Sequence, residues 1–223
     1  MAARLVVVTG TGTGIGKTHV SEALLRALSD SLPRVIGLKP VESGVGQGER
    51  SDRERLDSAS SFHVQQSGYS FAPPVSPHLA ARESGETIEA GVLLSMVAGV
   101  REQTDLTLVE LPGGLFTPLS PSLLNVDVVR GLRADFVLLV APDRLGVLHD
   151  VLAAATAAAS SGVAFSAIAL VAPEVADSAT CRNMLELQLF LPKPRLYELP
   201  RASVNHLLTH PALVALAREI LPV

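Results

Sequence analysis

The chain has 223 residues, of which 48% are apolar and only 4% aromatic, so it can bury a large core built from aliphatic side chains. Its 18 Lys and Arg against 22 Asp and Glu give a net charge of −4, which argues against a generic basic surface for nucleic acid or anionic lipid. The single cysteine, Cys181, excludes an internal disulfide, and no apolar run reaches the roughly 18 residues that span a bilayer, so we expect a cytoplasmic protein.

Short apolar runs alternate with helical patterns along the whole chain. Strands are expected, in chain order, at residues 5–9, 35–39, 106–110, 136–141, 165–172 and 195–199. Helices are expected at residues 17–30, 87–103, 145–160, 180–191 and 211–220, with Thr87 as the N-cap of the second helix. The strands are almost continuously apolar, which is typical of strands buried on both faces of a parallel sheet. We therefore expect one α/β domain over residues 1–223, a doubly wound, mostly parallel sheet with helices on both faces.

Two stretches carry no clear strand pattern. Residues 42–52 contain three glycines and are expected to form a flexible loop near the active site. Residues 67–77 are rich in Pro and Ser and are expected to be irregular. Ligands of doubly wound sheets bind at the carboxyl ends of the strands, so the polar residues that follow the strands are the candidates for function.

The first strand leads into a glycine-rich loop that opens a helix. The loop is Gly10-Thr11-Gly12-Thr13-Gly14-Ile15-Gly16, and Lys17-Thr18 follow it. Its backbone N–H groups are expected to bind nucleotide phosphates, with Lys17 on the β and γ phosphates and the Thr18 hydroxyl on Mg²⁺. The alternative is a glycine-rich turn without a ligand, but the order of strand, loop, Gly-Lys-Thr and helix favours a P-loop NTPase-like fold. Five residues rather than the usual four separate Gly10 from Gly16, so the loop is a variant.

Charged residues follow the next two strands. Lys39, stiffened by Pro40, is expected to face the same cavity as Lys17, where two ammonium groups suit the transfer of a phosphoryl group. Glu110 ends the third strand in a position suited to binding Mg²⁺. The alternatives are a solvent-exposed strand end for Lys39 and a surface turn for Glu110. For Asp52, the chemistry alone equally allows a simple N-cap or first-turn acid of a short helix.

In their order and spacing these motifs resemble dethiobiotin synthetase. The resemblance lies in the run Gly10–Thr18, followed by Lys39-Pro40-Val41-x-Ser43-Gly44, Ser51-Asp52, Ser76-Pro77-His78, Val109-Glu110-x-x-Gly113-Gly114 and Pro118-Leu119-Ser120. Weaker matches continue at Leu145-Gly146, Val171-Ala172 and Glu198-Leu199-Pro200. The Lys-Pro-Val motif and the glycine pair after Glu110 make the resemblance more specific than the loop alone.

The resemblance implies a homodimeric, ATP- and Mg²⁺-dependent ligase of biotin biosynthesis. Such enzymes carboxylate one amine of 7,8-diaminononanoate with CO₂, phosphorylate the carbamate with ATP, and close a cyclic urea when the second amine expels phosphate. Lys17 and Lys39 are then implied as catalytic residues, and Thr18, Asp52 and Glu110 as the ligands of Mg²⁺. Further implied contacts are Gly12, Thr13, Gly14, Ile15, Gly16, Gly113, Pro173 and Pro200 with the nucleotide, and Thr13, Ser43, Gly146 and His149 with the substrate.

Five positions depart from the family pattern. Relatives usually carry acids where Gly12 and Gly14 stand, so any contact from those acids to the diamine is absent here. Pro112 lacks an N–H group and removes one backbone donor to an anion. Pro173 replaces an Asn that reads adenine, so the base must be held in another way. His149 replaces an Asn near the substrate carboxylate, where it either donates to that carboxylate or has a structural role.

Two other functions compete with the ligase. A nucleotide-switch ATPase of the ParA or MinD type shares the expected fold, but its loop normally carries a lysine near the start, which the run Gly10–Gly16 lacks. A degenerate homologue that binds nucleotide but has lost the diamine site is suggested by Gly12, Gly14, Pro112 and Pro173.

Overall fold

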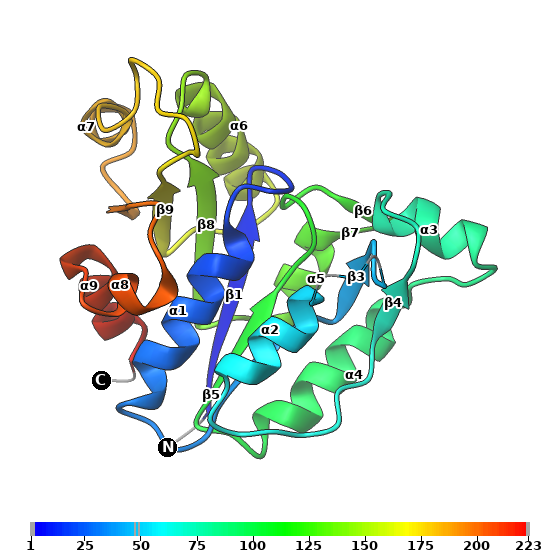
Figure 1. The fold of residues 1–223 in the computed structure, drawn as a ribbon. Coiled ribbons are helices and arrows are strands. Elements are labelled where there is room, and N and C mark those ends of the chain that lie inside the picture. Colours follow the sequence, from blue (N-terminus) through cyan, green and yellow to red (C-terminus); the bar gives the residue numbers. More distant parts are fainter. Residues whose placement is uncertain (1–2, 47, 49, 222–223) are drawn as a thin grey trace.

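A six-stranded sheet forms the centre of the computed structural model, which describes residues 3–46, 48 and 50–221 (Figure 1). The strand order is β10-β9-β8-β1-β5-β2, and every neighbouring pair is parallel. The strands are β1 Arg4–Gly10, β2 Val35–Leu38, β5 Leu106–Glu110, β8 Phe136–Pro142, β9 Ala167–Val171 and β10 Arg195–Leu199. The six expected strands and the mostly parallel α/β fold are thus confirmed.

The sheet separates two layers of aliphatic core. Along β1, Val7 packs into one layer while Val6 and Val8 pack into the other, and all three side chains are fully buried. This alternation explains why the strand is apolar at every position, because both faces of a central parallel strand are covered.

Helices cover both faces of the sheet (Figure 1). One core layer contains buried residues from α1 Lys17–Ser29, α2 Asp52–Ala59, α8 Val204–Leu208 and α9 Pro211–Ile220. The other contains buried residues from α3 Pro77–Glu83, α4 Ala90–Arg101, α5 Asn125–Leu132, α6 Val147–Ser160 and α7 Asn183–Phe190. Within the described residues, no helix combines the length and the apolar character that crossing a bilayer demands.

The five expected helices correspond to α1, α4, α6, α7 and α9, but α4, α6 and α7 begin two or three residues later than predicted. The prediction of Thr87 as an N-cap is wrong, because α4 begins at Ala90 with Glu89 as its N-cap. The intervening Ile88 is fully buried in the core, so packing holds these residues out of the helix. Helix α7 begins at Asn183 rather than at residue 180, since Cys181 has a φ angle of 64°, which a right-handed helix excludes.

Four strands of only two or three residues lie where the sequence shows no hydrophobic pattern. Strands β3 Val41–Ser43 and β4 Tyr69–Phe71 pair in parallel, so the expectation of irregular chain is wrong at these residues. Strands β6 Pro118–Ser120 and β7 Leu123–Leu124 form an antiparallel pair. Segments of two or three residues are too short to show a hydrophobic period, which is why the sequence did not reveal them. Gln47 and Glu49, within the expected flexible loop, lie outside the described residues.

Candidate active site

The loop between β1 and α1 has the backbone geometry of an anion site. Gly14 and Gly16 have φ angles of 71° and 96°, a region that residues with a Cβ rarely adopt. Gly16 is also the N-cap of α1, and a Cβ there would approach Val171 to 3.2 Å. In the described structure no side chain caps α1, so the N–H groups of its first turn are available to an anion at the positive end of the helix.

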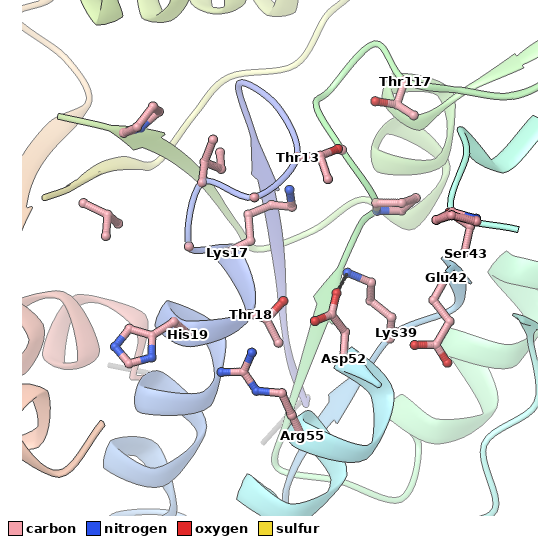
Figure 2. A pocket seen from close by; sticks show the side chains of 18 of the residues that line it. Thr13, Lys17, Thr18, His19, Lys39, Glu42, Ser43, Asp52, Arg55 and Thr117 are labelled. Carbon is pink, nitrogen blue, oxygen red and sulfur yellow. Dashed lines mark hydrogen bonds and ion pairs between the residues drawn. The ribbon is translucent and has the colours of Figure 1, made fainter. Parts of the chain in front are cut away.

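A cavity of about 1140 Å³ opens beside this loop, at the carboxyl ends of the strands. Its lining includes residues 13–18, Lys39, Glu42, Ser43, Asp52, Pro112, Gly113, Thr117, Val171, Ala172 and Ser203. Figure 2 shows Thr13, Lys17, Thr18, Lys39 and Asp52 gathered around it from separate elements. Small-molecule sites usually have volumes of about 300–1,000 Å³, so this cavity has room for a nucleotide and a second small molecule.

Four polar residues that the sequence singled out contact one another here. The Lys39 ammonium donates to Glu110 Oε1 at 2.6 Å and to Asp52 Oδ2 at 2.8 Å. The Thr18 hydroxyl donates to the same Glu110 oxygen at 2.8 Å. Lys39 and Glu110 are buried, whereas the Asp52 side chain is partly exposed toward the cavity. The alternatives of a solvent-exposed Lys39 and of Glu110 at a surface turn are therefore excluded.

Asp52 is an acid of a first helical turn, and its side chain also faces the cavity. It lies in the first turn of α2, whose N-cap is Ser51, and Ser51 and Glu54 form a capping box that fixes the start of the helix. From there its carboxylate contacts Lys39, as the dashed line in Figure 2 marks.

The charges of the site follow from burial and from these ion pairs. Burial, and then the neighbouring Lys39 ammonium, lower the pKa of Lys17 to about 8. Burial alone would also lower the pKa of Lys39, but the Glu110 and Asp52 carboxylates outweigh it and raise this pKa above its usual value. Burial opposes ionisation of Asp52, yet the Lys39 ammonium lowers the pKa of that carboxyl. At neutral pH the cavity therefore holds two ammonium groups next to ionised Asp52.

Three polar residues that the sequence analysis missed support this arrangement. Ser21 donates to Glu110 Oε2 at 2.7 Å, so both carboxylate oxygens of Glu110 are bonded. Asn125 donates to the carbonyls of Pro112 and Gly114, and the Gly114 N–H donates to the Thr117 hydroxyl, which stabilises the loop after β5. Ser21 could have been found, because it lies three residues after Thr18 and thus on the same helix face.

The remaining predicted site residues divide into two groups. Ser43 and Gly113 line the cavity, and the Ser43 hydroxyl donates to the Val75 carbonyl at 2.6 Å. Gly12, Pro173, Pro200, Gly146 and His149 are not among its lining residues. The Gly12 carbonyl instead accepts a hydrogen bond of 2.6 Å from Lys17. Gly146 is the N-cap of α6 and His149 is exposed in its first turn, so their contacts with substrate stay predictions.

Comparisons with known proteins agree with this geometry. Residues 4–208 match the AAA_26 family model, described as an AAA domain. In fold, the chain is similar to MinD of the MinC:MinD complex of Aquifex aeolicus, with a TM-score of 0.60, 14% identity, and 99% of this chain and 98% of the other covered. It is similar to the same extent, with a TM-score of 0.60 and 15% identity, to MinD from Pyrococcus horikoshii, solved with Mg-ADP, with 98% of this chain and 96% of the other covered. At this identity the similarity concerns the fold alone.

The curated relatives are much closer in sequence. ATP-dependent dethiobiotin synthetase BioD 1 of Escherichia coli O157:H7 is 34% identical over 207 residues, which cover 89% of this chain and 91% of the relative. The BioD protein of Caulobacter sp. is 40% identical over 172 residues, covering 73% and 74% of the two chains. Identity of 34–40% over 73–89% of this chain distinguishes these relatives from the MinD proteins, so the chain belongs to the family of ATP-dependent dethiobiotin synthetases.

Proposed function

We propose that this protein makes dethiobiotin from 7,8-diaminononanoate, CO₂ and ATP. One amine takes up CO₂ as a carbamate, the γ phosphoryl group of ATP moves to a carbamate oxygen, and the second amine closes the urea ring and expels phosphate. The observation that supports this proposal is that Lys17 and Lys39 line one cavity together with Thr18 and Asp52. An anionic carbamate that meets a triphosphate needs such a concentration of positive charge.

The phosphates of ATP would bind at the loop between β1 and α1. Backbone N–H groups of the loop, whose residues 13–16 line the cavity, and the positive end of α1 favour the polyphosphate, and Gly113 lines the same cavity. Lys17 would exchange its bond with the Gly12 carbonyl for the β and γ phosphates. Two negative phosphates near its ammonium raise the pKa of Lys17 from about 8, which keeps it charged during phosphoryl transfer.

Residues of the cavity also fit Mg²⁺. The donors are the hydroxyl of Thr18 and the carboxylates of Asp52 and Glu110, and Mg²⁺ accepts such oxygen ligands together with phosphates and water. Among the described residues, no group of three or more His, Cys, Asp or Glu gathers as a metal site, as zinc would require. When bound, Mg²⁺ neutralises charge on the β and γ phosphates.

Lys39 would hold the carbamate. Its ammonium is charged and already lies at the carboxyl end of β2, so it can bind carbamate oxygen and stabilise the charge that develops as the phosphoryl group arrives. Thr13 and Ser43 line the same cavity and offer hydroxyl groups to the substrate. Carbamate formation needs an unprotonated amine, and the nearby ammonium groups favour that form. The wall made by Pro74, Val75 and Pro112 suits the alkyl chain of the diamine.

A homodimer explains the residues that lie apart from the cavity. The exposed positions of α4 are Gly91, Val92, Ser95, Ala98 and Gly99, and none carries a charge. Leu145, beside the predicted substrate residues Gly146 and His149, is 73% exposed. A partner subunit that covers such apolar surface would bring the start of α6 to the other subunit's substrate. Analytical ultracentrifugation tests this, since Val92→Asp is expected to weaken the dimer.

An assay with purified protein, MgATP, bicarbonate and 7,8-diaminononanoate tests the function. We expect release of ADP that depends on the diamine, together with dethiobiotin detected by mass spectrometry. ATP hydrolysis that does not depend on the diamine would support a nucleotide switch instead. Binding of nucleotide without any turnover would support a degenerate homologue, and either result would refute the ligase. The cytoplasmic location stays a prediction.

A further inference from the structure

Lys39 lies at a break between two strands. Strand β2 ends at Leu38, whose partner is Val109, and β3 begins at Val41, so Lys39 is beyond the last paired residue of the central sheet. Its side chain is long and flexible, whereas a catalytic ammonium must be held to within a fraction of an ångström. Contacts other than the β ladder must therefore fix its main chain.

Arg53 supplies these contacts from the first turn of α2. Its Nη2 and Nε donate to the Lys39 carbonyl at 3.0 and 3.3 Å, and Nη2 also approaches the Tyr69 carbonyl at 3.4 Å. The preceding residue, Asp52, contacts the ammonium of the same lysine. One turn of helix thus contacts Lys39 at both its ends, the carbonyl through Arg53 and the ammonium through Asp52.

Glu42 in turn fixes Arg53. Its Oε2 accepts the Arg53 backbone N–H at 3.3 Å, and its Oε1 lies 3.5 Å from Arg53 Nε and accepts from the Ser70 hydroxyl at 3.1 Å. Glu42 is 5% exposed, so its charge lies in a poorly hydrated place where an ion pair is strongly directional. The carboxylate therefore determines both where the guanidinium points and where the main chain next to Asp52 lies.

The backbone leaves a space for the guanidinium. Gly68 has a φ angle of 143°, and a Cβ there would lie 2.4 Å from the Pro40 carbonyl oxygen and 3.2 Å from Arg53 Nη2. Any larger residue at this position would push against both the turn that carries Lys39 and the group that holds it. Three segments that are distant in sequence therefore meet at one arginine.

We infer that Glu42 and Arg53 are positioning residues for the reaction, which act through Lys39 and Asp52. The inference rests on the roles proposed above for those two residues. If the inference holds, a substitution at Arg53 that keeps the positive charge but removes the two-pronged guanidinium should slow turnover. It should leave substrate binding nearly unchanged.

Arg53→Lys is the direct test, with Glu42→Gln as a second variant. Lysine keeps the charge but cannot donate to both carbonyls in a fixed plane. We expect kcat to fall about tenfold or more, since small displacements of catalytic groups have large effects on rate, with both KM values changed less than about threefold. A crystal structure of the variant is expected to show the Lys39 ammonium displaced from Asp52, to which it is 2.8 Å distant in the wild type.

Arg101→Lys is the matched control. Arg101 also bonds a backbone carbonyl, that of Ala3, and a carboxylate, that of Asp135, but at the amino ends of the strands and thus away from the cavity. The kcat of Arg101→Lys is expected to stay within about twofold of the wild type, even where this variant loses as much melting temperature as Arg53→Lys does. A fall of kcat in Arg53→Lys no larger than in this control would overturn the inference, as would a rise of KM alone.

Two further outcomes are covered by the design. If Arg53→Lys does not fold, Glu42→Gln weakens the hold on the guanidinium at nearly constant side-chain size, and unchanged kcat in that variant overturns the inference. If the wild type lacks diamine-dependent turnover, the proposed function fails, but the crystal structure still decides the positioning role. If the crystal structures show Lys39 in the same position in the variants as in the wild type, the positioning role is refuted even without an activity measurement.

Discussion

The boundary between the neighbouring strands β1 and β8 divides the sheet into two halves, and the strands of the two halves lead into different kinds of structure. On one side, β1, β5 and β2 lead to Lys17, Glu110 and Lys39, which share one cavity or its buried floor. On the other side, β8, β9 and β10 lead to loops whose predicted site residues, Gly146 and Pro173 among them, are not in the cavity lining. We call the first side the phosphate half and the second side the outer half. The outer half adds Val171, Ala172 and Ser203 to the cavity wall, but Lys17, Lys39 and Glu110 all come from the phosphate half.

The carboxylates of the two halves bond to different kinds of groups. In the phosphate half, Glu110 and Asp52 face side-chain ammonium and hydroxyl groups that a reacting ligand can replace. In the outer half, Asp143 accepts from the Cys181 N–H and the Asn183 amide, and Asp177 accepts from backbone N–H groups, so both hold loops in shape. The carboxylates of the outer half thus hold loops in shape, whereas those of the phosphate half face groups that the proposed ligands would contact.

The largest effect is expected from removing either ammonium group of the phosphate half. Lys17→Ala and Lys39→Ala are each expected to reduce turnover at least about 100-fold, since a preorganised charge that acts on the transition state is lost. Loss of Lys39 also leaves Glu110 buried without its cation, which costs about 3–5 kcal/mol of unfolding free energy. Steady-state rates are measured under conditions where circular dichroism shows each variant folded.

Lys193 provides the control, because it is the only other lysine of the sequence and lies beyond the cavity lining. Lys193→Ala is expected to retain turnover within about twofold, as exposed substitutions usually do. Normal activity in either of the other two variants would contradict the role given to the phosphate half.

The same division separates what the sequence predicts from what it does not. The glycine loop, Lys39 and Glu110 are recognisable because each follows an apolar strand directly, and parallel strands bring their carboxyl ends to one edge. Asn125 escaped notice because a single amide group on a helix has no distinctive spacing, whereas the position of Ser21 three residues after Thr18 was a usable signal. The pairing of β3 with β4 escaped because three-residue strands show no period, and the bond from Arg53 to Lys39 joins segments that only the folded chain brings together.

A second prediction concerns pH and the phosphate half. Burial, together with the Lys39 ammonium, lowers the pKa of Lys17 to about 8, and bound phosphates favour the charged form. Above pH 8 the free protein must therefore take up a proton to bind nucleotide, so its dissociation constant is expected to rise by up to about tenfold per pH unit. Below pH 7 the dissociation constant should be constant. Calorimetric titration with MgADP between pH 6.5 and 9.5 measures this.

Lys17→Arg is the matched variant for this measurement. A guanidinium stays charged throughout the range, so its nucleotide affinity, whatever its absolute value, should not change between pH 7 and 9.5. A wild-type affinity that is equally constant would show that Lys17 does not titrate in this range.

A smaller effect is expected from Ser21, the residue that completes the coordination of Glu110. Ser21→Ala leaves Glu110 Oε2 buried without its donor, and an unsatisfied buried acceptor costs about 1–3 kcal/mol of unfolding free energy. Denaturant unfolding measures this loss. Ser29→Ala is the control on the same helix, since the Ser29 hydroxyl only donates to the Leu25 carbonyl one turn earlier. Equal losses in the two variants would mean that Ser21 does not stabilise the carboxylate.

The smallest effect is expected in the outer half, at Asp177. Its Oδ2 accepts the Leu145 N–H at 2.7 Å, directly before Gly146, and its Oδ1 accepts from Ala179 and Thr180. These backbone bonds lower the pKa of Asp177, so its stabilising effect is present at neutral pH and is lost as the pH falls through that lowered pKa.

Asp177→Asn removes the charge and one acceptor while keeping the size of the side chain. If the start of α6 contacts the substrate of a partner subunit, KM for the diamine should rise about threefold while the dissociation constant of MgADP is unchanged, because the loop is loosened rather than lost. Hydrogen exchange at the Leu145 amide should become faster. Glu186→Gln, at an exposed position of α7, is the control. A change in nucleotide affinity with an unaltered KM for the diamine would mean that Asp177 affects the nucleotide site. The two sides of the sheet would then not differ in function in this way.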